Sequence, residues 1–304
     1  MKITIKNIVK SFGNQKVLDN ICFSVNKGEL LGFLGPNGAG KSTLMKILTG
    51  YLPADSGEVW LGGRRIDVNK VEIKKNIGYL PEHNPLYTEL YVKEHLSLAA
   101  GLYKLPDKAQ NIKRIIELTG LGSEQHKKIN MLSKGFRQRV GLAQTLIHDP
   151  PVLILDEPTT GLDPNQLEEI RGLIKQLSKE KTVIISTHIM QEVEAVCNRA
   201  VIINKGRLIA DGSIYELKTG SFNANQTVIA GFSKNIDLNQ LLALKGIKSA
   251  YISGGLWNIE SDGKHDLREV IFNFAVNNNL ILLTLVEKQQ NLENIFRRLT
   301  TDSQ

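Results

Sequence analysis

A glycine-rich segment in the N-terminal part of the sequence has the pattern of a phosphate-binding loop. Residues 35–43 read GPNGAGKST and match G-x-x-x-x-G-K-[ST]. Glycines allow successive backbone N–H groups to point into one concavity, where they can hold phosphate oxygens. We expect Lys41 to reach the β- and γ-phosphates of a nucleotide and the Ser42 hydroxyl to ligate Mg²⁺. The nucleotide-binding residues predicted in this segment are Asn37, Gly38, Gly40, Lys41, Ser42 and Thr43.

Two adjacent carboxylates follow an apolar run in a second segment. Residues 151–158 read PVLILDEP, and the run predicts a buried strand that ends near Asp156. Asp156 would hold Mg²⁺ through the water shell of the metal. Glu157 would orient an attacking water or accept its proton. Alone this pattern is weak, because many strands end in an acidic residue, but beside the phosphate loop it indicates nucleotide hydrolysis.

The order of apolar runs indicates the elements that position these segments. Short runs in residues 1–65 alternate with turn residues and predict strands, one of which leads into the phosphate loop. Residues 88–148 instead repeat apolar residues at helical spacing, which predicts a mainly helical insert. The continuous apolar runs within 151–158 and 181–188 are typical of strands covered by helices on both faces. We therefore predict an α/β fold around a parallel sheet.

Charge and pattern both change near residue 219. The chain has 304 residues and a net charge of +7, and residues 1–218 carry the whole excess, with 30 Lys and Arg against 23 Asp and Glu. Residues 219–304 carry eight of each. Their runs predict the order β-α-β-β-α-β of a small α+β (ferredoxin-like) unit, followed by a final helix from Leu292 to Leu299. The predicted domains are 1–219 and 220–304, with a linker around Gly220.

The composition excludes a disordered tail, a collagen and a disulfide-stapled mini-protein. Hydrophobic residues make up 41% and charged residues 23%, as in soluble globular proteins. No apolar run reaches the roughly 18 residues of a transmembrane helix, and the N-terminus lacks a run of signal-peptide length. Cys22 and Cys197 have no metal-ligand spacing and are expected to be reduced, buried thiols. The basic first segment leaves nucleic acid, an acidic small ligand or an anionic membrane surface open as partners.

Four further features complete the pattern of a known family. Residues 132–139 read LSKGFRQR, Leu162-Asp163-Pro164 follows the acidic pair, and His188 ends a predicted strand. Phe12 falls where the family places an aromatic ring that stacks on adenine. In this order, residues 1–217 resemble the ATP-binding subunits of ABC transporters. The resemblance implies a P-loop NTPase fold with an antiparallel β subdomain and a helical insert, and ATP and Mg²⁺ as cofactors.

The resemblance also implies roles for the remaining residues. His188 would contact the γ-phosphate and support the water that Glu157 polarises. Ser133 and Gly135, in the signature motif, would bind the ATP held by a second subunit. The chain is therefore expected to dimerise head-to-tail around two ATP, as a homodimer, with Asp163 at the seam between the copies.

Two positions depart from the pattern of the family. Glu82 stands where the family has a glutamine that offers an oxygen to Mg²⁺ and a contact to the membrane partner, and we expect Glu82 still to sense the metal. Lys134 and Phe136 stand where the signature has glycine and glutamine. Because Ser133 and Gly135 remain, hydrolysis is still expected.

The resemblance implies an integral membrane permease as partner and a peripheral place at the cytoplasmic face of the cell inner membrane. The permease would contact the surface around residues 82–87, with Leu86 and Tyr87 as candidates. YLPEHNPLY, LSKGFRQRVGLAQ and NLENIFRRLT further resemble the ABC-2 export class, and within it the gliding-motility-associated ATP-binding subunit.

Two alternatives to a transporter subunit stay open. A soluble ABC ATPase that acts on ribosomes or nucleic acid usually has two ATPase cassettes or a long coiled-coil insert, which this sequence lacks, so no nucleic-acid partner is expected. An unrelated P-loop kinase or GTPase is disfavoured by the signature motif and His188.

Overall fold

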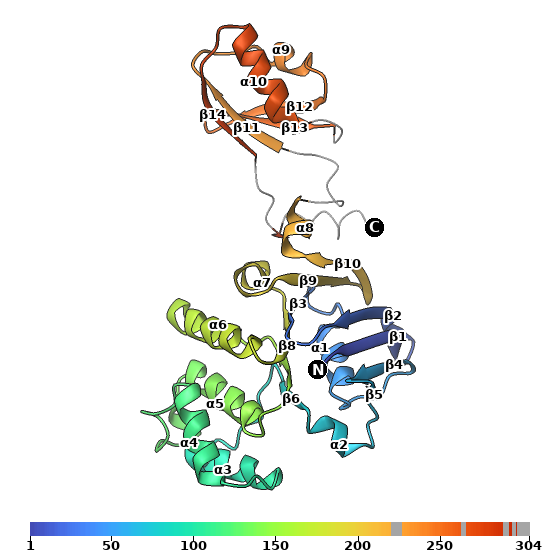
Figure 1. The fold of residues 1–304 in the computed structure, drawn as a ribbon, viewed down its shortest axis with the longest axis vertical. Helices are drawn as coiled ribbons and strands as arrows, with labels where there is room; N and C mark the ends of the chain where they lie inside the picture. The colour runs from blue at the N-terminus through green and yellow to red at the C-terminus, as the bar shows by residue number, and fades with distance from the viewer. Residues whose placement is uncertain (220–226, 263–265, 288–291, 294–295, 297–304) are drawn as a thin grey trace. The chain divides into compact units, whose positions relative to one another are not determined.

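The computed structural model describes residues 1–219, 227–262 and 266–287, together with 292–293 and 296. The chain forms two compact units, one spanning Met1–Ile214 and one that begins at Tyr215 (Figure 1). The predicted boundary, at residues 219 and 220, lies a few residues further along the chain. The predicted linker lies in part, and the predicted final helix for the most part, outside the described residues.

A six-stranded sheet forms the centre of the first unit. In spatial order its strands are β10 (Arg207–Ser213), β9 (Arg199–Asn204), β3 (Leu30–Leu34), β8 (Thr182–Thr187), β7 (Val152–Asp156) and β6 (Ile77–Leu80). All neighbours are parallel except β10 with β9 at one edge. Every residue of β3, β7 and β8 is buried, which explains why their apolar runs are continuous rather than alternating.

The strand order sets the place of the predicted site. Because β3, β8 and β7 are parallel neighbours, their carboxyl ends lie at the same edge of the sheet. β3 leads into the phosphate loop, β7 ends at Asp156, and β8 ends one residue before His188. The helices that pack on this sheet include α1 (Lys41–Leu48), α6 (Pro164–Ser178) and α7 (Met190–Val196).

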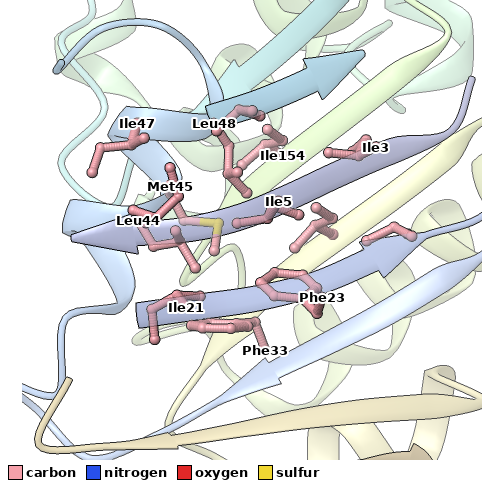
Figure 2. Packing of buried hydrophobic residues seen from close by; sticks show 14 of the residues in the cluster. Ile3, Ile5, Ile21, Phe23, Phe33, Leu44, Met45, Ile47, Leu48 and Ile154 are labelled. Carbon is pink, nitrogen blue, oxygen red and sulfur yellow. The ribbon is translucent and has the colours of Figure 1, made fainter. Parts of the chain in front are cut away.

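An antiparallel sheet packs against α1. Its strands, in spatial order, are β2 (Gln15–Val25), β1 (Ile3–Phe12), β4 (Ser56–Leu61) and β5 (Arg64–Arg65). Figure 2 shows inward side chains of β1 and β2 meeting Leu44 and Met45 of α1. Phe23 of β2 stacks on Phe33 of β3 with ring centroids 5.7 Å apart, which ties the two sheets together. The short helix α2 (Val71–Lys74) follows β5.

The alternation of inward and outward side chains along β2 corrects one expectation about the cysteines. Both thiols are free, and Cys197 is buried, but Cys22 is exposed. Ile21 and Phe23, on either side of Cys22 in β2, point into the core. Since successive side chains of a strand point to opposite faces, Cys22 must point outward. The prediction of two buried thiols was wrong for Cys22.

The segment predicted to be helical contains three helices and one 3₁₀ turn. These are α3 (Val92–Leu102), α4 (Lys108–Leu118), η1 (Ile129–Met131) and α5 (Lys134–Leu146), drawn in green in Figure 1. The apolar residues at helical spacing in α3, such as Val92 and Leu96, form its buried face. This insert separates β6 from β7 in the sequence, although the two strands are neighbours in the sheet.

The second unit has the element order β-α-β-β-α-β. After α8 (Ile214–Thr219) come β11 (Thr227–Phe232), α9 (Leu238–Leu242), β12 (Ile247–Ser253), β13 (Leu256–Ser261), α10 (Leu267–Asn277) and β14 (Leu282–Glu287). The sheet has the order β12-β13-β11-β14, and all its neighbours are antiparallel. Its core includes Trp257 and Ile259 of β13 and Ile271 and Phe274 of α10.

The close packing of α7 on β3 gives a stability prediction. A Cβ atom added to Gly32 would overlap the side chain of Val193, so we expect Gly32→Ala to destabilise the first unit by about 1–3 kcal/mol. Gly172, in α6, has nothing within 4 Å of such an atom, and Gly172→Ala should stabilise by about 0.5–1 kcal/mol.

Urea unfolding checks both changes. The chain has two tryptophans, so a Trp257→Phe background leaves Trp60 to report on the first unit alone. Equal midpoints for the two glycine variants would contradict the packing argument.

Candidate active site

The phosphate loop, residues 35–40, connects β3 to α1. Gly38 and Gly40 have φ angles of 79° and 104°, which L side chains rarely adopt. A Cβ atom on Gly40 would also lie 2.9 Å from the carbonyl oxygen of Val17 in β2. The backbone of Ala39 accepts a hydrogen bond from Gly206 at 3.2 Å. The loop is therefore held by neighbouring backbone as well as by its own sequence.

Lys41 is buried and points into the phosphate loop. Its ammonium donates to the carbonyl oxygens of Gly35, at 2.9 Å, and Pro36, at 3.3 Å. The Nζ atom also lies 3.6 Å from Oε1 of Glu157, and both side chains are only 6% exposed. The loop and the acidic pair, predicted separately from the sequence, thus meet at one buried cation.

Glu157 lies between Lys41 and His188. Its two carboxylate oxygens are 2.9 and 3.0 Å from Nδ1 of His188, and the Thr160 hydroxyl donates to Oε2 at 3.1 Å. Glu157 has a φ angle of 50°, a conformation that is uncommon outside glycine and costs free energy. His188 is partly exposed while Glu157 is buried. Glu157 and His188 therefore form a line of contacts from the buried ammonium of Lys41 to the surface of the protein.

Asp156 is a buried carboxylate with two hydroxyl donors. Ser186 and Ser42 donate to it. Burial raises the pKa of Asp156 above its usual value, and the charges of Glu157 and Glu82 act in the same direction, while the two hydroxyls oppose them. A carboxylate crowded by two others favours a divalent cation.

A cavity of about 430 Å³ opens beside Asp156. Ser42, Glu82 and Asp156, the three predicted Mg²⁺ ligands, all line it. Burial raises the pKa of the neighbouring Tyr79 phenol, and the charges of Asp156 and Glu82 add to this effect. The part of the chain that the structure describes has no cluster of three or more His, Cys, Asp or Glu suited to a metal. Mg²⁺ bound with a nucleotide needs only one or two carboxylates, since phosphates and waters complete its shell.

The signature residues lie at the start of α5, against the segment that carries Asp163. Ser133 caps α5, and its hydroxyl accepts the backbone N–H of Phe136 at 3.3 Å. A Cβ atom on Gly135 would overlap the side chain of Gln166 in α6. Asp163 in turn caps α6 by accepting the N–H of Gln166 at 3.0 Å.

Lys134, which departs from the family's pattern, covers Gly161 so closely that a Cβ atom there would collide with its ammonium. None of the hydrogen bonds that the structure gives to Ser133 or Gly135 reaches the phosphate loop. No hydrogen bond of these two residues therefore joins the two predicted halves of the site within one chain.

Phe12 lies at the end of β1, beside the turn into β2. Phe12 is 51% exposed, and Nζ of Lys10 lies 5.5 Å from its ring centroid. Lys10 is held by Asp55 at 2.6 Å. An exposed ring beside a fixed cation can stack on a planar base.

Three polar residues of this region escaped the sequence analysis. Thr159, Thr187 and Glu192 are buried next to the Glu157–His188 pair, and both threonine hydroxyls donate to the Glu192 carboxylate. Thr187 and the neighbouring Ser186 interrupt an otherwise apolar run, which is a signal that a buried polar partner is needed. Glu192 gives no such signal, because an acidic residue in the first turn of a helix is common.

Comparisons with known proteins place this geometry in a family. The family model described as "ABC transporter" matches residues 18–160. The linearmycin resistance ATP-binding protein LnrL of Bacillus subtilis (strain 168) is 33% identical over 302 residues, 97% of each chain. The chain belongs to the ATP-binding subunits of ABC transporters. Family membership makes this subunit an ATPase and confirms the general expectation of ATP hydrolysis.

Two further similarities support the assignment. The bacitracin transport ATP-binding protein BcrA of Bacillus licheniformis is 38% identical over 218 residues, 71% of this subunit and 71% of BcrA. A solved dimer of an ATP-binding cassette, in a post-hydrolysis state with ADP and Pi, superposes with a TM-score of 0.64 at 25% identity. It covers 69% of this subunit and 98% of that chain. The subunit therefore has the P-loop fold of ABC ATPases.

The environment of Asp156 gives a prediction about stability and metal binding. The pKa of Asp156 is higher in the folded state than in the unfolded state. At a pH above the folded-state pKa, the ionised carboxylate therefore lowers the free energy of unfolding. This cost falls as the pH drops through the folded-state pKa and is gone below the unfolded-state pKa. We expect Asp156→Asn to raise the stability of the ligand-free subunit by about 0.5–2 kcal/mol at pH 8. The difference in stability between this variant and the wild type should shrink as the pH approaches 4.

Thermal unfolding with and without Mg²⁺ and ATP measures both effects. The variant should lose the part of the ATP-induced stabilisation that depends on Mg²⁺. A variant that is less stable than the wild type at pH 8 and still gains the Mg²⁺-dependent part would contradict the assignment.

Proposed function

We propose that this chain is the ATP-hydrolysing subunit of an export-type transporter and drives a separate membrane permease. The observation that carries the proposal is that buried Lys41 and Glu157 meet partly exposed His188 at the ends of three neighbouring strands. The similarity to LnrL over nearly the whole of both chains supports the export type, as does the transport role named for BcrA.

Hydrolysis rests on positioning and charge. Backbone N–H groups of the loop, including those of Asn37, Gly38 and Gly40, hold the phosphates, and Lys41 leaves its loop carbonyls to neutralise them. Glu157 takes the proton of the attacking water. His188, which is hydrogen-bonded to Glu157, contacts the γ-phosphate. Thr43 and Phe12 complete the contacts to phosphate and adenine.

Ser42, Asp156 and Glu82 are the residues that would hold Mg²⁺. Their oxygens are ligands that Mg²⁺ prefers, and the raised pKa of Asp156 supports a cation beside it. When bound, the metal neutralises charge that develops on the phosphates. Before that, Ser42 and Ser186 hold the Asp156 carboxylate in place through their hydroxyls.

The site is completed by a second copy of the chain. Ser133 and Gly135 stand at the N-terminal end of α5, where backbone N–H groups and the helix dipole favour an anion. They bind the ATP held by the phosphate loop of the partner subunit, and Asp163 lies at the seam. The absence of a hydrogen bond from these residues to their own phosphate loop fits this arrangement.

The permease docks beside the cavity at Glu82. Tyr87 is 63% exposed and Leu86 is half-buried, so the segment can receive the apolar end of a helix. Among the described residues, no helix is long and apolar enough to span a membrane. The subunit acts at the cytoplasmic face of the cell inner membrane, and nucleic acid is not its partner.

The C-terminal unit is an accessory domain of ferredoxin-like type. Its element order and antiparallel sheet support that type, and the match to LnrL extends over it. The domain stabilises the dimer or regulates it. The narrower link to gliding motility remains a hypothesis based on sequence resemblance alone.

Glu157→Gln tests the proposed chemistry. The amide keeps the shape but cannot accept the proton, so kcat for ATP should fall by about 10²-fold or more, with ATP affinity within about threefold of the wild type. Glu180→Gln, at an exposed position, is the matched control and should change neither quantity. Undiminished hydrolysis by the Glu157 variant would overturn the catalytic assignment.

The same variant tests the choice of partner. Purified with ATP from detergent-solubilised native membranes, it should bring down a protein with several membrane spans. Recovery of ribosomes or nucleic acid without a membrane protein would favour the soluble alternative and contradict the transporter proposal.

A further inference from the structure

The carboxylate of Glu192 is buried at the start of α7, and each of its oxygens binds a different threonine. Glu192 is 3% exposed. Its Oε1 accepts from the Thr159 hydroxyl at 2.5 Å and its Oε2 from the Thr187 hydroxyl at 3.0 Å. Burying an ionised carboxylate costs several kcal/mol unless its oxygens are hydrogen-bonded. The two hydroxyls meet this need.

The two threonines lie next to the catalytic pair in the sequence. Thr159 follows Glu157 by two residues, and Thr187 directly precedes His188. The Thr187 hydroxyl also accepts the backbone N–H of Ile189 at 3.1 Å, so it holds both flanks of His188. A single carboxylate therefore bridges the segment after β7 and the last residue of β8.

The helix that carries Glu192 is fixed to the central sheet. Val193, the next residue, packs so closely on β3 that a Cβ atom at position 32 would overlap its side chain. β3 continues directly into the phosphate loop. Glu192 is thus held relative to the strand that positions Lys41, while its oxygens bind the segment after Glu157 and the end of β8 before His188.

A role in helix stability alone does not explain this arrangement. An acidic side chain in the first turn stabilises a helix through its dipole, but an exposed one already does so. Exposure would also avoid the cost of burial. The burial of this carboxylate between two threonine donors is instead explained by the contacts that it makes with other segments of the fold.

We propose that Glu192 is a positioning residue that sets the spacing between Glu157 and His188 in the hydrolytic site. The inference rests on the proposed role of that pair in ATP hydrolysis. Glu192 does not touch the nucleotide. It acts through Thr159 and Thr187, and losing it lets the segment after β7 move relative to the end of β8 while the phosphate loop keeps its shape.

Steady-state ATPase kinetics of the full chain separate positioning from folding. For Glu192→Ala we expect kcat to fall at least tenfold, with KM for ATP changed less than threefold, since misplacement of catalytic groups by about 1 Å can cost 10²-fold. Glu192→Gln keeps one oxygen acceptor and should restore at least a third of the wild-type kcat. Gln191→Ala, at an exposed position of the same helix, is the matched control and should leave kcat unchanged.

A double-mutant cycle tests the route through the threonine. Thr159→Val removes the hydroxyl with little change of shape and should lower kcat by itself. In combination with Glu192→Ala it should add almost nothing, because both changes break the same hydrogen bond. Multiplicative losses in the double variant would overturn the proposal.

Two other results would contradict the positioning role of Glu192 without contradicting the proposed function of the site. If Glu157→Gln abolishes hydrolysis but Glu192→Ala hydrolyses ATP within twofold of the wild type, the positioning role is wrong and the proposed function stands. If Glu192→Ala loses kcat only in proportion to a loss of ATP binding and thermal stability, its role is structural, and the proposal is again wrong.

Discussion

The site depends on the parallel pairing of β3, β8 and β7. Their carboxyl ends lie side by side, so residues far apart in the sequence, Lys41, Glu157 and His188, meet within a few ångströms. The result is a buried ammonium beside a buried carboxylate, with a partly exposed imidazole on the other side. Such a cluster is a weak source of stability, because desolvation offsets the attraction between the charges. Its retention, with Glu157 at a positive φ angle, is typical of a functional site.

The same fold leaves the site incomplete. The insert between β6 and β7 carries the signature motif on α5, where Ser133 caps its own helix and Gly135 packs on α6. Lys134 covers Gly161, so the signature and the Asp163 segment lie against each other and form one surface. In the proposed transporter, that surface meets the nucleotide of the partner subunit, and ATP is the contact that joins the two copies.

The sequence predicted those parts of the site whose chemistry is local. The phosphate loop needs glycines and one lysine at fixed spacing, and the strands that lead to Asp156 and His188 are continuous apolar runs. Family resemblance added Ser133 and Asp163. The contacts of Glu192 and Ser186 could not be predicted, because they join segments whose approach depends on the tertiary fold. Cys22 was misjudged because its apolar neighbours were taken as a sign of burial, whereas Ile21 and Phe23 occupy the inward face of β2 and side-chain alternation places Cys22 on the opposite face.

The most direct test of the composite site is the mass of the ATP-bound chain in solution. In analytical ultracentrifugation with Mg²⁺ and ATP, a Glu157→Gln chain that also carries Ser133→Arg is compared with Glu157→Gln alone. Ser123→Arg, at an exposed position of the insert, is the control substitution. We expect Glu157→Gln alone, and with Ser123→Arg, to sediment at twice the mass of a single chain. The Ser133→Arg chain should bind ATP equally well but stay single. Dimerisation of that chain, or loss of ATP binding by it as a single chain, would contradict a site shared between two copies.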